Sequence, residues 1–195
     1  MGFTRDELEA QYGRSVPDLV GDDLRLLIVG INPGLWTAAT QTHFAHPGNR
    51  FYPALHRAGI TEWAIDPSAG MSDEDRAMLV RRGVGITNLV NRATARADEL
   101  DTGELVAGGR RLEAFVADRG PRVVALAGLG AYRTAFARPK ASKGRQDERI
   151  ADIEVWLVGN PSGLNAHETV DTLAQQFRTV ADVAGVRTDG PGADT

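Results

Sequence analysis

The amino-acid sequence predicts one α/β domain in three layers, with a short, mainly parallel sheet between two layers of helices. Short apolar runs, which are typical of buried strands, alternate with segments whose apolar residues recur at helical spacing. No segment between them carries a hairpin signal, so a parallel sheet covered on both faces is favoured. We expect this domain over residues 1–186, followed by a disordered, Gly- and Asp-rich tail over residues 187–195.

Each element follows from a local pattern. Apolar runs predict strands at residues 25–29, 84–89, 122–127 and 153–158. Apolar residues at helical spacing predict helices over residues 48–58, near residues 132–136 and over residues 167–183. Two more helices begin at capping-box signals, one opened by Ser72 that runs through Leu79 and one opened by Asp101.

Composition limits the function classes. A chain of 195 residues with 42% apolar and 25% charged residues is typical of a soluble globular domain. The net charge of −4 provides no global attraction to nucleic acid or membrane, which argues weakly against a DNA partner. The absence of cysteine excludes disulfides and thiolate metal sites. Without a signal-peptide pattern or a membrane-spanning run, we expect a cytoplasmic protein with no membrane partner.

Two loops of similar chemistry follow predicted strands. Residues 30–34 read Gly-Ile-Asn-Pro-Gly after the first strand, and residues 160–164 read Asn-Pro-Ser-Gly-Leu after the last. Each is a tight, Gly- and Pro-containing turn that presents an asparagine amide. Loops at the carboxyl ends of parallel strands line the ligand crevice of an open sheet. We therefore expect both loops to converge on one pocket.

Five motifs in a fixed order carry a family resemblance. They lie at residues 30–34, 44–51, 85–90, 107–110 and 160–164. In this order and spacing they resemble the mismatch-specific uracil-DNA glycosylases, whose animal relatives are the thymine-DNA glycosylases. The resemblance extends from about Leu26 to about Val180 and implies the uracil-DNA glycosylase-like fold. It also implies flipping of a mispaired base out of duplex DNA and hydrolysis of its N-glycosidic bond, without a cofactor.

The resemblance assigns roles to residues of the first loop. Asn32 positions the attacking water, Phe44 stacks on the flipped base, and the backbone N–H groups of Ile31 and Phe44 bind the pyrimidine carbonyls. Gly34 leaves space beside pyrimidine C5, so larger bases such as 3,N4-ethenocytosine and thymine are expected to fit. The simpler alternatives are that Asn32 is a turn residue and Phe44 a core residue.

Three more polar residues are expected in the base pocket. Asn88 matches the animal branch, as does Thr94, and is expected to hydrogen-bond the base. Thr37 is expected to line the pocket, and Asn160 to brace the loop or the pocket. Each of these residues could equally have a purely structural role.

The second loop is expected to fill the gap left by the flipped base. Leu164 at its tip is the apolar wedge, and Gly163 and Asn165 are expected to help recognise the opposite guanine. The alternative for Leu164 is packing against the last helix. The chain reads Asn-Ala-His after Leu164, where bacterial relatives often carry Ser-Arg.

Scattered cations are expected to contact the DNA backbone. The candidates are Arg50, Arg92, Arg110, Lys140 and Lys143. The last two lie in a basic segment, residues 138–149, that is expected to be a mobile loop and could simply be solvated. The four histidines show no metal-ligand spacing, so no metal site is expected. The expected partner is double-stranded DNA with G·U or related mismatches, bound by a monomer.

Two other function classes remain open. A catalytically silent damage-binding protein would keep Phe44 and Leu164 but hydrolyse nothing, and the presence of Asn32 argues against it. A nucleotide- or nucleoside-processing enzyme would also suit a parallel sheet. The first strand lacks a dinucleotide-binding or phosphate-loop motif, which argues against that class.

Overall fold

A computed structural model describes residues 2–189 of the chain. Its sheet has five strands in the order β2-β1-β3-β5-β4. The strands are β1 (Leu26–Gly30), β2 (Val84–Asn88), β3 (Val123–Ala127), β4 (Gly144–Arg145) and β5 (Glu154–Val158). All neighbouring pairs are parallel except β4 with β5. The predicted α/β class with a mainly parallel sheet is confirmed.

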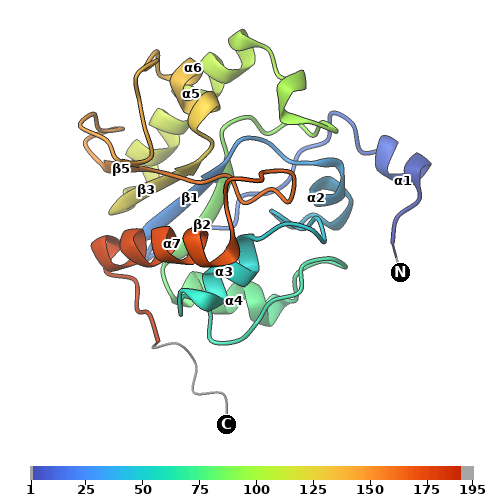
Figure 1. Cartoon of the computed structure of the whole chain (residues 1–195), viewed down its shortest axis with the longest axis horizontal. Coiled ribbons are helices and arrows are strands. Elements are labelled where there is room, and N and C mark those ends of the chain that lie inside the picture. The colour runs from blue at the N-terminus through green and yellow to red at the C-terminus, as the bar shows by residue number, and fades with distance from the viewer. Residues whose placement is uncertain (1, 190–195) are drawn as a thin grey trace.

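Helices cover both faces of the sheet (Figure 1). One layer contains α5 (Thr102–Arg119) and α6 (Leu129–Ala135), and the other contains α3 (Phe51–Arg57), α4 (Asp73–Arg81) and α7 (Val170–Ala184). Successive side chains of β1 point to opposite faces, so each strand contributes to two cores. Leu26 and Ile28 pack in the core on the α3, α4 and α7 side, whereas Leu27 and Val29 pack on the α5 and α6 side.

Helix boundaries follow the capping chemistry. Ser72 and Asp101 form the predicted capping boxes at the starts of α4 and α5. The last helix begins at Val170 rather than residue 167, because Thr169 accepts a hydrogen bond from the Thr172 N–H and caps it. The helix expected from residue 48 begins at Phe51, after the Pro-Gly-Asn turn at residues 47–49.

Several elements were not predicted from the sequence. They are α1 (Arg5–Glu9), α2 (Leu35–Thr40), the 3-10 helix η1 (Ala97–Glu99) and β4. The expectation of a mobile loop over residues 138–149 is wrong in part, because β4 lies within it and pairs with β5. Of the expected tail, Asp189 donates its N–H to the Gly59 carbonyl and pairs with Arg82, and residues 190–195 lie outside the described residues.

The parallel register brings several strand ends to one edge of the sheet. Gly30 at the end of β1 lies opposite Asn88 at the end of β2, and Ala127 of β3 lies opposite Val158 of β5. The loops that follow these strands therefore start at the same edge. No helix among residues 2–189 is long and apolar enough to cross a membrane.

Close packing of α5 against the loop after β2 should be sensitive to one methyl group. A β-carbon on Gly108 would lie 2.4 Å from the Leu89 carbonyl oxygen, whereas one on Gly130 of α6 would meet no atom within 4 Å. We expect Gly108→Ala to lower the free energy of unfolding by about 1–3 kcal/mol. We expect Gly130→Ala to be neutral or to raise it by up to about 1 kcal/mol. Urea denaturation measures both, and equal stability of the two variants would contradict this packing.

Candidate active site

A cavity of about 550 Å³ opens where the loops after β1, β2 and β5 meet. All of the residues predicted to form the base pocket line it, together with Asn32 and the expected wedge. These residues are Ile31, Asn32, Gly34, Thr37, Phe44, Asn88, Asn160, Gly163 and Leu164. Segments that are more than 100 residues apart in the sequence thus share one cavity, as expected for loops at the carboxyl edge of a parallel sheet.

The side chain of Asn32 is held by two hydrogen bonds. Its Nδ2 donates to the Arg92 carbonyl oxygen at 2.9 Å and to the Thr94 hydroxyl oxygen at 2.7 Å. The Thr94 hydroxyl donates its own hydrogen to the Arg96 carbonyl at 2.8 Å, so its oxygen can only accept from Asn32. Because both partners of Nδ2 are acceptors, the orientation of the amide is fixed. Oδ1 of Asn32 is left as an acceptor in a residue that lines the cavity.

Phe44 forms an aromatic platform at the cavity. Its ring stacks on Phe51 with the centroids 4.1 Å apart and the planes 25° apart. Gly30 makes room for the ring, since a β-carbon there would lie 3.1 Å from the tip of Phe44. The backbone at Phe44 has a φ of 56°, an uncommon conformation for a bulky residue. One face of the ring is covered by Phe51, and the residue also lines the cavity, so it is both a packing residue and a pocket residue.

Asn88 is oriented by a buried histidine. The ring nitrogen Nε2 of His43 lies 2.9 Å from the Pro17 carbonyl, which can only accept, so Nε2 carries the proton. In the neutral ring Nδ1 is then an acceptor, and Nδ2 of Asn88 donates to it at 3.1 Å. Oδ1 of Asn88 is therefore directed away from His43. Burial lowers the pKa of His43, although the Pro17 hydrogen bond and Asp18 partly oppose this, and the ring stays neutral at neutral pH.

Two backbone donors and one open space complete the cavity. The N–H groups of Ile31 and Phe44 donate no hydrogen bond within the part of the chain that the structure describes, and both residues line the cavity. Gly34 has a φ of −75°, which any residue can adopt, and a β-carbon there would meet no atom within 4 Å. The wall of the cavity is therefore open at Gly34.

The loop from Asn160 to Asn165, here called the wedge loop, is braced by its own side chains. Oδ1 of Asn160 accepts from the Ser162 N–H at 3.0 Å, and Nδ2 of Asn165 donates to the Asn160 carbonyl at 2.9 Å. Leu164 at its tip is 93% exposed. This exposure contradicts the alternative that Leu164 packs against the last helix. Such an exposed leucine on a braced loop can enter a base stack.

Comparison with known proteins identifies the family. The family model of the uracil DNA glycosylase superfamily matches residues 17–183, which include the whole cavity. The chain belongs to the uracil DNA glycosylase superfamily. A solution NMR structure of a protein assigned as a uracil DNA glycosylase from Methanosarcina acetivorans is similar in fold, with a TM-score of 0.56 and 15% sequence identity. The match covers 86% of this chain and 98% of that one.

Membership of this superfamily implies DNA glycosylase activity, a hydrolysis of N-glycosidic bonds in DNA that belongs to base excision repair. The cavity contains an oriented acceptor on Asn32, an aromatic platform on Phe44, and the backbone N–H groups of Ile31 and Phe44, which donate no hydrogen bond within residues 2–189. No group of three or more His, Cys, Asp or Glu residues within residues 2–189 could hold a metal ion.

Three of the five cations expected to bind the DNA backbone have other partners within residues 2–189. Arg50 donates to carbonyl groups of the wedge loop, at 3.0 Å to Ser162 and 3.0 Å to Asn165. Arg92 forms a two-pronged ion pair with Glu104, at 2.6 Å and 2.9 Å. Asn165 was expected to help recognise the guanine opposite the flipped base. Both ends of its amide already form hydrogen bonds within residues 160–167.

Lys143 is paired with a buried carboxylate. Its Nζ lies 2.6 Å from Glu168, which is 3% exposed and also accepts from Thr172 and Gln176. Burial alone would raise the pKa of Glu168, but the Lys143 pair and the two hydrogen bonds lower it below the usual value. No local pattern indicates this pair, because Lys143 and Glu168 are far apart in the sequence and neither lies in a motif. Lys143 therefore anchors β4 to the start of α7 instead of offering a free charge.

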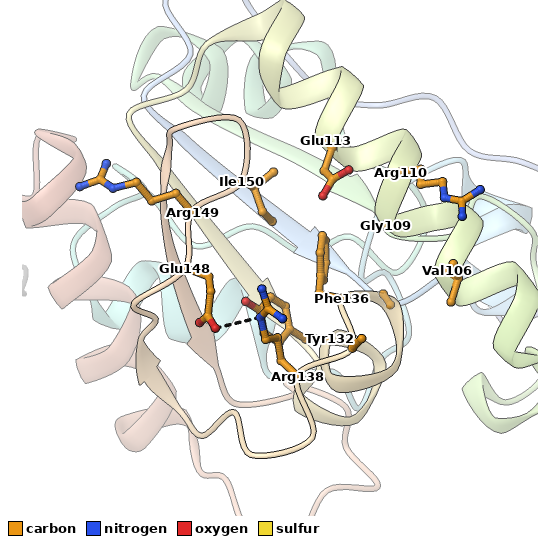
Figure 2. A pocket seen from close by; sticks show the side chains of 12 residues that line it. Val106, Gly109, Arg110, Glu113, Tyr132, Phe136, Arg138, Glu148, Arg149 and Ile150 are labelled. Atoms are coloured by element: carbon orange, nitrogen blue, oxygen red, sulfur yellow. Dashed lines mark ion pairs between the residues drawn. The ribbon is translucent and has the colours of Figure 1, made fainter.

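Arg110 lies at a different cavity. This second cavity, of about 310 Å³, lies between α5, α6 and residues 148–150 and does not include the predicted base pocket. Figure 2 shows Tyr132 and Phe136 side by side in it, next to the ion pair of Arg138 with Glu148. Lys140 lines a further hollow in the segment from Ala137 to Glu148. Neither Arg110 nor Lys140 lines the base cavity, so the five cations do not form one surface around it.

The neutral state of His43 predicts a pH dependence of stability. Its pKa in the folded protein lies below the ordinary value of 6.5. At pH values between the folded and the unfolded pKa, His43 binds a proton in the unfolded chain but not in the folded chain. The contribution of His43 to the free energy of unfolding is therefore fully present above about pH 6.5 and is lost as the pH falls. We expect His43→Gln to lose this contribution. The difference in free energy of unfolding between wild type and variant, measured from about pH 8 to 5, should shrink as the pH falls. A constant difference would contradict a buried neutral histidine.

Proposed function

We propose that this chain is a monofunctional, mismatch-specific DNA glycosylase that acts as a monomer and leaves an abasic site. Its proposed substrates are uracil, 3,N4-ethenocytosine and thymine opposite guanine in double-stranded DNA. The observation that carries the proposal is the fixed orientation of the Asn32 amide, whose Oδ1 accepts no hydrogen bond within residues 2–189, in a residue that lines the same cavity as Phe44. The motif resemblance to the mismatch-specific and thymine-DNA glycosylases supports the same subfamily.

In the proposed reaction, Asn32 positions water and does not remove its proton. Oδ1 of Asn32 accepts a hydrogen bond from the water, whose oxygen bonds to C1′ of the flipped nucleotide. The bond between C1′ and the base nitrogen breaks, and its electron pair leaves with the base. The water then loses its proton, and the departing base takes up a proton from solvent. An amide is a poor base, so the site depends on alignment and on stabilisation of the departing anion.

The departing base is stabilised by groups around it. The N–H groups of Ile31 and Phe44 donate to the carbonyl oxygens on which negative charge grows. Phe44 stacks on the ring, an interaction worth roughly 1–3 kcal/mol per base. In this proposal, Oδ1 of Asn88, which is turned away from His43, accepts the N3–H that uracil and thymine carry. Thr37 contributes a hydroxyl at the pocket wall, and Asn160 supports both the wall and the wedge loop.

A nick assay on a duplex with one G·U pair tests the proposal. Strand cleavage after alkali supports a glycosylase. A retarded complex without cleavage would instead indicate a catalytically silent binding protein, which would also keep the Phe44 platform and the exposed Leu164. If the protein neither cleaves nor binds the duplex, the remaining candidate is a nucleotide-processing enzyme. The same assay with ethenocytosine and thymine opposite guanine tests the proposed substrate range.

Asn32→Ala should abolish most base release and leave DNA binding nearly intact. Removing a positioning group is expected to lower the single-turnover rate by about 10²- to 10⁴-fold. Thr94→Val is the matched variant, since it keeps Asn32 but removes one of the two acceptors that orient it. We expect Thr94→Val to fall between wild type and Asn32→Ala. Cleavage by Asn32→Ala at the wild-type rate would remove Asn32 from the mechanism.

Gly34→Tyr should suppress excision of thymine far more than excision of uracil. The ring would occupy the open space proposed to lie beside pyrimidine C5, where thymine carries a methyl group and uracil only a hydrogen. The backbone at Gly34 tolerates a side chain, because its φ is negative. Single-turnover rates on both substrates measure the effect, and circular dichroism checks that the variant folds. An equal loss on both substrates in a folded variant would contradict the proposal that pyrimidine C5 lies next to Gly34.

A further inference from the structure

Arg50 holds the wedge loop through several carbonyl groups. Its guanidinium donates at 3.0 Å to Ser162, at 3.0 Å to Asn165 and at 3.5 Å to Gly163. Its backbone N–H donates at 2.9 Å to Pro161. All four acceptors lie in the wedge loop, on both sides of its exposed tip. A single side chain therefore ties the two ends of the turn that carries the wedge.

The same contact joins the wedge loop to the aromatic platform. Arg50 directly precedes α3, whose first residue, Phe51, stacks on Phe44. The backbone of Gly163 approaches closely as well, because a β-carbon there would lie 2.5 Å from the Gly48 carbonyl oxygen. The wedge loop is thus packed against the segment that carries the platform. A displacement of the wedge loop should therefore displace the segment that carries Phe51.

Arg50 forms no ion pair within residues 2–189, and its hydrogen bonds end on neutral carbonyls. The fork geometry of a guanidinium suits several acceptors at once, which a lysine ammonium cannot match in the same way. Both Nη1 hydrogens, which bind Ser162 and Asn165, would have to leave the wedge loop to bind a phosphate, whereas Nε donates no hydrogen bond within residues 2–189. The geometry therefore favours a bracing role over a backbone contact.

We propose that Arg50 is the positioning residue of the wedge, one that holds Leu164 ready for insertion as a base flips onto Phe44. This inference rests on the proposed glycosylase function. A flexible loop would have to be ordered during insertion, and a braced loop avoids that entropic cost. Arg50 thereby acts through Leu164, not on the reacting atoms.

The first test needs no activity. Because the chain has no cysteine, Leu164→Cys gives one unique site for a nitroxide spin label. We expect Arg50→Ala to raise the mobility of this label clearly, and Arg57→Ala to leave it unchanged. Arg57 is the matched control, since it lies at the other end of α3 and pairs with Asp171. Unchanged label mobility in a folded Arg50→Ala variant would overturn the inference whether or not the protein is a glycosylase.

The second test measures single-turnover excision of uracil from a G·U duplex by wild type, Arg50→Ala, Leu164→Ala and the double variant. We expect each single variant to lose about 10- to 100-fold, and the double variant to lose no more than Leu164→Ala. Additive losses, or a salt slope of binding lowered by about one in Arg50→Ala, would indicate a phosphate contact and overturn the proposal. Failure of wild type to cleave would instead overturn the proposed function.

Discussion

The orientation of one amide is the constraint on which the chemistry of this site depends. Asn32 has a donor end and an acceptor end, and only the acceptor end can hold a water ready for attack. The Thr94 hydroxyl and the Arg92 carbonyl together take the donor end, and the Arg96 carbonyl fixes the hydroxyl. These three residues belong to the segment after β2, whereas Asn32 follows β1. The parallel pairing of β1 with β2 brings the two segments together, so the fold itself sets the amide.

The same principle recurs across the cavity. Asn88 is oriented by His43, which is in turn oriented by the Pro17 carbonyl, and the wedge loop is braced by Arg50. In each case, hydrogen bonds to a buried ring or to backbone carbonyl groups fix a part of the site before any ligand binds. Such preorganisation avoids the cost of ordering groups during the reaction. It also suits a site without a carboxylate in the Asn32 loop, since a weak catalyst depends more on alignment than a strong one does.

The sequence was informative where chemistry is local. Capping boxes at Ser72 and Asp101, apolar runs and the two Asn-Pro loops predicted most of the fold and the residues that line the cavity. It could not predict contacts between distant side chains. Nothing near Arg50 indicates that its guanidinium meets carbonyl groups more than 100 residues later, and Lys143 looked solvated because its partner, Glu168, lies in another segment. A two-residue strand such as β4 is also too short to give a periodic signal.

A crystal structure with duplex DNA would test the central role of Asn32 most directly. The DNA should carry a 2′-fluorinated deoxyuridine opposite guanine, because an electron-withdrawing fluorine at C2′ disfavours the cationic character that develops at C1′. We predict that the uracil stacks on Phe44 and that a water lies within hydrogen-bond distance of Asn32 Oδ1, in line with the glycosidic bond. Nδ2 should remain on Thr94 and Arg92. An Asn32 amide that turns its Nδ2 to the DNA, with no water on Oδ1, would contradict this mechanism.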